Sequence, residues 1–283
     1  MRQQYSIYLN GSYFNADQPV LRSKNRAFLY GDALFETMLS SNGAIPFLND
    51  HVERLQRSME ILKMRIPFNF NTSFFENETG RLLRRNKFFK WSRIRITVFR
   101  NEGGFYTPDT NDVSLLIECS PLAYNKFVVS REGMAIDAYT EHFKPVTRLS
   151  AVKSTNALLF VLAGNYRKEN NLDECIILNQ KRFVCETISS NIFLVKNSKI
   201  YTPSFSTACL PGVMRKQVIN LILENNIIFS EVDSITLDHI AEADEVFITN
   251  AVSGIKWVSM YRDSRYFNKM SSFLVNELNK LVV

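Results

Sequence analysis

The stretch that decides the fold of this chain reads Glu186-Thr-Ile-Ser-Ser-Asn-Ile-Phe193, then Ile200-Tyr-Thr-Pro203, then Leu210-Pro-Gly-Val-Met-Arg215. It predicts a buried strand that carries one acid, a short hairpin, and a helix that begins at Gly212. The first N–H groups of a helix, here those of Val213 and Met214, lack partners within the helix and bind anions well, phosphate above all. A carboxylate on an apolar strand is costly to bury alone, so Glu186 is expected to face a cation.

An acid and a phosphate-binding helix start together indicate a ligand that has a cationic nitrogen and a phosphate, and pyridoxal phosphate fits that description. The stretch also resembles the signature of the class IV aminotransferases, the fold-type IV pyridoxal-phosphate enzymes. That signature runs Glu, then Asn-aliphatic-aromatic, then aliphatic-x-Thr, then aliphatic-x-Gly-aliphatic-x-Arg, and every position is filled here. An ordinary strand, hairpin and helix with a chance acid is the alternative.

Composition limits the class of protein. The chain has 283 residues, of which 46% are hydrophobic, so it suits one or two domains with a large core. No run approaches the roughly 18 apolar residues of a membrane span. The four cysteines include no Cys-x-x-Cys pair and the three histidines are isolated, which indicates a cytoplasmic protein with reduced thiols and no metal site. The net charge of +6 favours an anionic substrate or cofactor, but it is too small to indicate nucleic-acid binding.

Lys153 stands in a loop just ahead of an apolar helix. A partly buried lysine loses its charge more easily, and a neutral amine is the nucleophile that forms a Schiff base. A solvated surface charge is the ordinary role of a lysine. Family members, however, place the cofactor lysine in Lys-[Ser/Thr]-x-Asn ahead of the signature glutamate, and here the spacing from Lys153 to Glu186 is 33 residues. The resemblance therefore implies that Lys153 is the Schiff-base lysine and the catalytic base and acid. It implies that Glu186 pairs with the protonated ring nitrogen and that Asn191 holds neighbouring hydrogen bonds.

A helix is predicted from a cap at Asn49 or Asp50 to about Met64. Arg54 lies in its first turn, where a cation is disfavoured by the helix dipole unless an anion binds nearby. The segment His51-x-x-Arg54-Leu resembles the family segment whose arginine grips the cofactor phosphate. The resemblance implies that role for Arg54, and a solvated surface arginine is the alternative.

Two Asn-Gly pairs predict hairpins, the first through residues 10–11 and the second through residues 42–43 into a strand over 44–48. Between them, Tyr30-Gly-Asp-Ala-Leu-Phe35-Glu-Thr37 resembles the family's N-terminal motif. The resemblance implies that Tyr30 and Phe35 line the substrate pocket and that Thr37 is a candidate proton relay. A turn with core aromatics is the alternative.

Residues 81–100 hold eight Arg or Lys and no acid. Interleaved aromatics make a nucleic-acid patch one interpretation. However, basic and polar residues alternate with apolar ones over 93–98, which predicts a half-buried strand with one polar face. Arg95 could then meet a substrate carboxylate, as the basic residue at the corresponding place does in the family; plain surface charge is the third interpretation. The loop after this strand looks like the family's glycine-rich active-site loop, with Phe105 where an arginine is often found.

The segment Thr249-Asn250-Ala251 departs from the transaminase pattern. Class IV transaminases usually have Thr-Gly-Thr here, the last threonine touching phosphate, whereas Ala251 offers only its backbone N–H. Asn-Ala followed by Gly-Ile-x-x-Val is more like the aminodeoxychorismate lyases, and Leu39 stands where branched-chain transaminases often carry an arginine. Both features favour a lyase that eliminates pyruvate from 4-amino-4-deoxychorismate to leave 4-aminobenzoate. A branched-chain or D-amino acid aminotransferase is the alternative, and a basic nucleic-acid-binding protein is the remote one.

The resemblance implies a two-domain α/β fold. A small N-terminal domain over residues 1–120 and a linker over 121–126 would precede a larger C-terminal domain over 127–283, which has a barrel-like sheet and opens with a strand over 127–130. The cofactor, pyridoxal 5′-phosphate, would lie between the domains, and the enzyme would be a homodimer. Its partner would be a small amino substrate that carries a carboxylate, with neither nucleic acid nor membrane involved.

Overall fold

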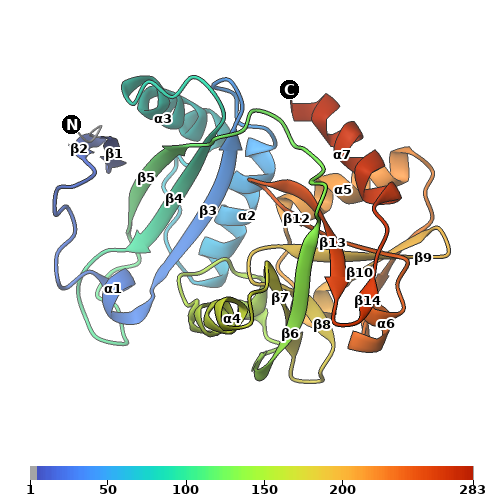
Figure 1. The fold of residues 1–283 in the computed structure, drawn as a ribbon. Coiled ribbons are helices and arrows are strands. Elements are labelled where there is room, and N and C mark those ends of the chain that lie inside the picture. The colour runs from blue at the N-terminus through green and yellow to red at the C-terminus, as the bar shows by residue number, and fades with distance from the viewer. Residues whose placement is uncertain (1–4, 283) are drawn as a thin grey trace. The chain divides into compact units, whose positions relative to one another are not determined.

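The computed structural model describes residues 5–282, which divide into two compact units (Figure 1). The first unit contains the chain up to residue 125 together with residues 152–156, and the second contains residues 126–151 and 157 onward. The short return segment lies along the edge of the first unit's sheet. The N–H of Phe35 donates to the carbonyl of Lys153 at 2.9 Å, and the N–H of Thr155 donates to that of Ala33 at 3.0 Å. A single linker at 121–126 does not account for this return.

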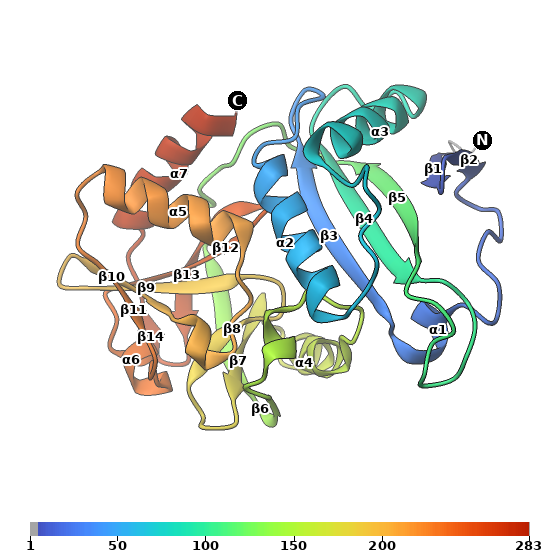
Figure 2. The same cartoon turned by 180° about the vertical axis from the view of Figure 1, so that it is seen from behind.

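The elements of the first unit are β1 (Ser6–Leu9), β2 (Ser12–Asn15), α1 (Arg26–Tyr30), β3 (Ala33–Ser40), α2 (Leu48–Ile61), α3 (Thr72–Arg85), β4 (Ser92–Arg100) and β5 (Val113–Pro121). The strands form one sheet in the order β2-β1-β5-β4-β3, with antiparallel neighbours. Helix α2 packs on β3, and α3 packs on β1 and β5 (Figure 2). Because side chains alternate along a strand, one face of the sheet is buried by these helices and the other is half-exposed within the unit.

The alternation over residues 93–98 is confirmed. Ile94, Ile96 and Val98 are buried in the core of the first unit, while Arg93 and Arg95 are half-buried on the other face. The hairpin through residues 10–11 is also confirmed, because Leu9 pairs with Ser12 across the turn.

Two local predictions in the first unit are wrong. Residues 44–48 form no strand, since only an isolated bridge joins Ser41 to Ala44 before the chain turns into α2. Helix α2 is not capped by Asn49 or Asp50. Its N-cap is Phe47, which has a φ of 60° and makes no side-chain cap. Asn49 instead lies inside the helix, where its amide donates to Glu53 at 2.7 Å.

The elements of the second unit begin with β6 (Met134–Lys144), the 3-10 helix η1 (Arg148–Ala151), α4 (Leu158–Glu169), β7 (Glu174–Asn179), β8 (Val184–Thr187), β9 (Asn191–Lys196), β10 (Lys199–Pro203) and the 3-10 helix η2 (Phe205–Thr207). They continue with α5 (Val213–Glu224), β11 (Phe229–Val232), α6 (Leu237–Ala241), β12 (Glu245–Asn250), β13 (Gly254–Tyr261), β14 (Ser264–Arg265) and α7 (Lys269–Val282).

The main sheet of the second unit curls on itself. Its strands follow the order β11-β10-β9-β12-β13-β6-β7-β8, with β14 paired to β13. Strand β8, at one end of this order, also contacts β9 and β10, which lie near the other end. Aliphatic side chains from β6, β7, β9, β12 and β13 fill the inside of the curl. The prediction of a mixed α/β fold with a barrel-like sheet is therefore confirmed.

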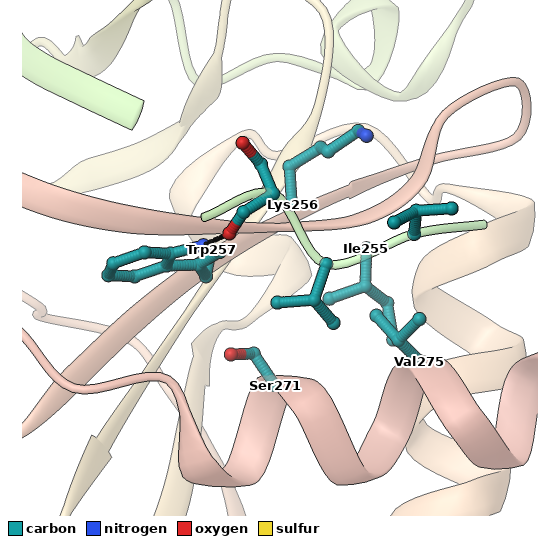
Figure 3. Close-up of a pocket in the computed structure, with 8 residues that line it drawn as sticks. Ile255, Lys256, Trp257, Ser271 and Val275 are labelled. Atoms are coloured by element: carbon teal, nitrogen blue, oxygen red, sulfur yellow. Dashed lines mark hydrogen bonds between the residues drawn. The ribbon is translucent and has the colours of Figure 1, made fainter. Parts of the chain in front are cut away.

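Helices cover the outside of the curled sheet. Helix α4 packs on β6 and β7, α5 packs on β12, and α7 packs on β12 and β13. Figure 3 shows Ser271 and Val275 of α7 lying beside Ile255 of β13. The strand predicted over 127–130 is absent, because the edge of β13 is occupied by β6 and the segment is held by side chains instead. The indole of Trp257 donates to the carbonyl of Ser130 at 2.6 Å.

Candidate active site

Three of the predicted site residues meet within the first unit. The ammonium nitrogen of Lys153 lies 4.6 Å from the ring centroid of Phe35, and the guanidinium carbon of Arg95 lies 4.0 Å from the same centroid. Thr37 is the register partner of Arg95 on the neighbouring strand, so its side chain points to the same face. The cations Lys153 and Arg95 can bind an anionic substrate on this half-exposed face of the sheet. The Thr37 hydroxyl and the Lys153 amine can transfer protons to it.

Tyr30 lies apart from that group. It ends α1, where its ring packs 4.9 Å from the Arg26 guanidinium carbon and 5.7 Å from the ring of Tyr106. Within the described residues, its ring contacts Arg26 of α1 and Tyr106 of the loop after β4.

Arg54 is not a solvated surface arginine. Its Nε donates to Glu36 Oε1 at 2.8 Å and its Nη2 to Glu36 Oε2 at 2.5 Å. His51 Nδ1 also lies 2.7 Å from that carboxylate, and both His51 and Glu36 are buried. Burial alone raises the pKa of Glu36, but the charge and hydrogen bonds of Arg54, with help from His51, bring it down from 4.5 to about 2. Burial lowers the pKa of His51 and so favours the neutral form of its ring.

Glu36 is a residue that sequence reasoning missed. On β3 it falls between the apolar residues Leu34 and Met38, on the face that α2 covers. Arg54 and His51 are three residues apart, hence on one face of α2. That pairing of an acid on an apolar strand face with two basic residues on the next helix was a readable signal.

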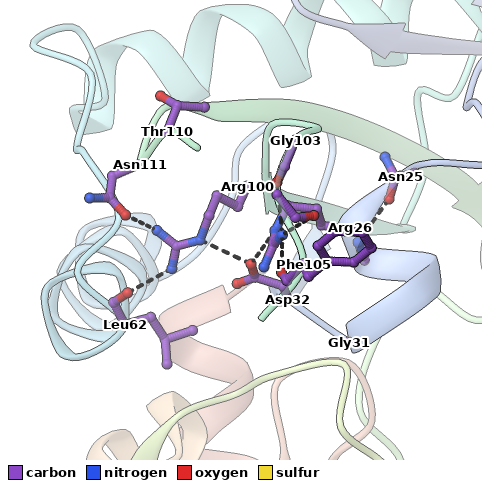
Figure 4. A network of polar contacts seen from close by, with 12 residues as sticks. Asn25, Arg26, Gly31, Asp32, Leu62, Arg100, Gly103, Phe105, Thr110 and Asn111 are labelled. Carbon is purple, nitrogen blue, oxygen red and sulfur yellow. Dashed lines mark hydrogen bonds and ion pairs between the residues drawn. The ribbon is translucent and has the colours of Figure 1, made fainter. Parts of the chain in front are cut away.

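A half-buried acid, Asp32, helps to hold the loop after β4 in place (Figure 4). Asp32 Oδ2 accepts from Arg26 Nε and from Arg100 Nε, each at 2.9 Å. Arg26 also donates to the carbonyls of Gly103 at 2.9 Å and Phe105 at 2.7 Å. The glycine-rich loop is thus held by its backbone, and the ring of Phe105 is left exposed.

Glu186 in the second unit already has a cation. Lys144 Nζ lies 2.6 Å from Glu186 Oε1, and the N–H of Leu210 donates to Oε2 at 2.8 Å. Both charged side chains are buried, and Lys144 makes a further hydrogen bond to the Ser150 carbonyl at 3.2 Å. Sequence reasoning expected a cation opposite Glu186 but missed Lys144, which lies 42 positions away in the chain.

The start of α5 is closely packed against Asn191. Asn191 Nδ2 donates to the carbonyl of Leu210 at 2.9 Å, and a Cβ built on Gly212 would stand 1.9 Å from Asn191 Oδ1. Glycine is therefore the residue that fits there. Helix α5 has Gly212 as its N-cap and receives no side-chain cap, so the described residues put no anionic group of their own on the N–H groups of Val213 and Met214.

The side chain of Asn250 stabilises the turn between β12 and β13. Its Oδ1 accepts from the N–H groups of Val252 and Ser253 at 3.0 and 2.8 Å, and its Nδ2 donates to Ser190 Oγ at 3.0 Å. A cofactor contact at this turn therefore falls to the backbone, that of Ala251 in particular, which carries no side-chain donor.

The described residues offer neither a reactive cysteine nor a cluster of metal-binding side chains. The cysteines of the described residues are all free thiols, and burial raises the pKa of Cys175 to about 12 and that of Cys209 to about 11. A thiol with so high a pKa is a weak nucleophile at neutral pH. Residues 5–282 bring together no three or more His, Cys, Asp or Glu side chains that could hold a metal ion. Over the same range, no helix has the length and apolar character needed to cross a membrane.

Comparisons with known proteins identify the family that the chain resembles. A profile of the family described as Amino-transferase class IV matches residues 33–260. A Methanocaldococcus jannaschii protein, provisionally named a branched-chain-amino-acid aminotransferase, is 30% identical over 250 residues, covering 88% of this chain and 85% of that protein. The aminodeoxychorismate lyase of Bacillus subtilis is 28% identical over 250 residues, covering 87% and 83%. The solved branched-chain aminotransferase of the archaeon Thermoproteus uzoniensis, with norvaline, is 20% identical with a TM-score of 0.85, covering 98% and 94%.

Proposed function

Because the chain belongs to the class IV aminotransferase family, whose members are pyridoxal-phosphate enzymes, we propose that it is a 4-amino-4-deoxychorismate lyase. The reaction would release pyruvate and leave 4-aminobenzoate. The observation that carries the choice of a lyase is the turn after β12, where Asn250 is used for backbone capping and Ala251 has no hydroxyl. Leu39 adds to it, because this position is buried and apolar rather than an arginine.

The residues of this chain fit the cofactor. Glu186 is buried, and its oxygens, which already accept from Lys144 and from the Leu210 N–H, each keep a further lone pair for a cationic ring nitrogen. The glycine-bounded start of α5 suits a phosphate, because a Cβ on Gly212 would collide with Asn191. Lys153 would hold the cofactor covalently through its amine, and Arg54 would contribute to phosphate binding through a guanidinium that Glu36 fixes in one orientation.

When bound, pyridoxal phosphate supplies an electron sink for charge that develops on the carbon skeleton of an amine substrate. Lys153, once the substrate amine has displaced it, would remove the proton from the ring carbon that bears the amine, and this is the proton that the enolpyruvate leaving group needs to become pyruvate. Arg95 binds a substrate carboxylate and holds the molecule against Phe35. Thr37, on the same face as Arg95, relays a proton to the departing enolpyruvate, which leaves as pyruvate.

A paired assay tests the proposal. One arm measures 4-aminobenzoate released from 4-amino-4-deoxychorismate, and the other measures keto acid formed from a panel of L- and D-amino acids. We expect activity in the first arm and its loss in Lys153→Ala, with the yellow colour of the bound cofactor lost as well. Activity in the second arm alone would refute the lyase assignment, and full activity of Lys153→Ala would refute the assigned role of the lysine.

A transaminase is the second candidate. Relatives carry the names of branched-chain-amino-acid aminotransferases and D-alanine aminotransferases at similar identity. The same lysine, glutamate and carboxylate-binding arginine would serve that reaction, in which the proton from the substrate goes to the cofactor and a keto acid leaves. The panel of L- and D-amino acids in the assay separates these two transaminases.

We also propose that the enzyme is a homodimer and works in the cytoplasm. Helix α4 exposes an apolar stripe at helical spacing, with Leu158 79%, Val161 55% and Leu162 42% exposed, while Ala163 on its other side is buried. Covering this stripe with a second copy would remove it from water, and free thiols suit a reducing compartment. Light scattering at micromolar concentration should give the mass of a dimer, and Val161→Lys should give a monomer. Leu223→Lys, at an exposed site on α5, is the control and should leave the dimer intact.

A further inference from the structure

The hydroxyl of Thr249 is buried and unpaired. Thr249 is 1% exposed, and its Oγ1 finds no hydrogen-bond partner among residues 5–282. Buried hydroxyls in folded proteins are nearly always paired, so an exception calls for a physical reason. Thr202 gives the usual arrangement in the same unit, since its Oγ1 donates to the carbonyl of Ile192 at 2.7 Å.

The strand register indicates where the Thr249 side chain lies. On β12 it is the antiparallel partner of Asn191 on β9, so the two side chains project from the same face of the sheet. Asn191 reaches Leu210 and Gly212 on that face, which is where α5 begins. Helix α5 also packs on β12. The unpaired hydroxyl therefore faces the side of the sheet on which α5 starts.

A residue on the same face of β12 caps the start of a second helix, α7, with a carboxylate. Glu245, four residues before Thr249, accepts from the N–H groups of Met270 at 2.9 Å and Ser271 at 3.3 Å, in the first turn of α7. Among residues 5–282, no side chain caps the start of α5 in this way. An uncapped helix start on the same side of the sheet as an unpaired hydroxyl donor is suited to an anion from outside the chain.

We propose that Thr249 is a ligand of the cofactor phosphate, donating its hydroxyl proton to a phosphate oxygen beside the N–H groups of Val213 and Met214. This inference rests on the proposed function, because it needs a phosphate-bearing cofactor. Thr249 is the last but one residue of β12, and Ala251 follows in the turn. The hydroxyl that Ala251 lacks would thus be supplied by a strand residue two positions before it.

The test measures the affinity of the apoprotein for pyridoxal 5′-phosphate and for pyridoxal, which lacks the phosphate. The proteins are the wild type, Thr249→Val, Thr249→Ser and the control Thr202→Val. Hydrogen bonds to a charged group are strong, so Thr249→Val should weaken pyridoxal 5′-phosphate binding by roughly 10- to 100-fold. Its affinity for pyridoxal should be unchanged, and Thr249→Ser should retain most of the wild-type preference for the phosphate.

The midpoint of thermal unfolding of the apoproteins gives a second readout, which should not fall where the cofactor affinity does. Removing a hydroxyl that has no partner should leave the midpoint of apo Thr249→Val unchanged or raised. Thr202→Val removes a hydroxyl that is paired, so its midpoint should fall while its cofactor affinity stays as in the wild type. A lowered apo midpoint or failure to fold for Thr249→Val would mean a structural hydroxyl and overturn the inference, as would equal losses for the two ligands. A wild type that does not bind pyridoxal 5′-phosphate at all would instead overturn the proposed function.

Discussion

Replacing Lys144 by methionine should destabilise the second unit far more than the loss of an ordinary salt bridge. The substitution keeps a side chain of similar length and removes only the charge that faces Glu186. Both side chains of the pair are buried, so the carboxylate left behind has little access to water. Removing one partner of a buried pair is costly because the other charge then stays buried without compensation.

The magnitude follows from the geometry. At an effective dielectric constant of about 20, two unit charges separated by the 2.6 Å between Lys144 Nζ and Glu186 Oε1 attract by about 6 kcal/mol. Desolvation of both groups offsets much of this attraction, and the measured cost of losing one partner is typically about 3–5 kcal/mol. In a unit of this size, each kcal/mol lowers the midpoint by about 2–4 °C, so the expected fall is on the order of 10 °C.

Calorimetry on the apoprotein measures this, and the chain offers a matched control. Lys280 lies at the same 2.6 Å from Glu277, but its side chain is 68% exposed. Exposed pairs contribute about 0–1 kcal/mol, so Lys280→Met should shift the midpoint by no more than about 4 °C. A double change, Lys144→Met with Glu186→Gln, should recover much of the lost stability because neither charge then remains. Equal small shifts for the two lysine variants, or a double variant no more stable than Lys144→Met, would refute the reasoning.

Three further outcomes are expected. The pKa of Glu36 falls from 4.5 to about 2 on folding, so its contribution of about 3 kcal/mol is present above pH 4.5 and is lost as the pH falls toward 2; the stability gap between wild type and Glu36→Gln should narrow over that range, and a constant gap would contradict it. Gly212→Ala should lower the unfolding free energy by about 1–3 kcal/mol because its Cβ meets Asn191, whereas Gly80→Ala inside α3, where the nearest atom is 3.4 Å away, should be neutral or stabilising. Arg95→Met should raise KM roughly 10- to 100-fold with the cofactor still bound, and steady-state kinetics with an unchanged KM would exclude Arg95 as the carboxylate ligand.

Local sequence patterns predicted the elements that depend mainly on neighbouring residues in the chain. The alternation over residues 93–98 predicted β4, and the Asn-Gly pair at residues 10–11 predicted the first hairpin. Helix α3 is equally local in origin, because Asn71 caps its start and its apolar face is periodic. The strand predicted over 127–130 failed because pairing depends on a distant neighbour, and β6 already occupies that edge of β13.

The candidate site divides in the same way. The motif residues of the site could be predicted from the sequence, because a motif is defined by residue types at fixed spacings along the chain. The partners of those residues could not all be read. Lys144, at the end of β6, reaches Glu186 of β8 across β7, which pairs with both strands, and no periodicity links the two positions. Thr249 is a similar case, because an unpaired hydroxyl is defined by what surrounds it in space.

In each unit, the buried acid of the candidate site is neutralised by a cation of the same unit, and this bears on whether the apoprotein folds. Glu36 is paired with Arg54 in the first unit and Glu186 with Lys144 in the second, so neither carboxylate depends on a cofactor for a counter-charge. Both units should therefore fold without cofactor, in contrast to sites whose charges are balanced only by what they bind. Added pyridoxal 5′-phosphate would then stabilise by mass action alone, by about 4 kcal/mol at a free concentration about 1,000 times Kd. An apoprotein that is unfolded by circular dichroism, and folds only when the cofactor is added, would show that these internal pairs do not suffice.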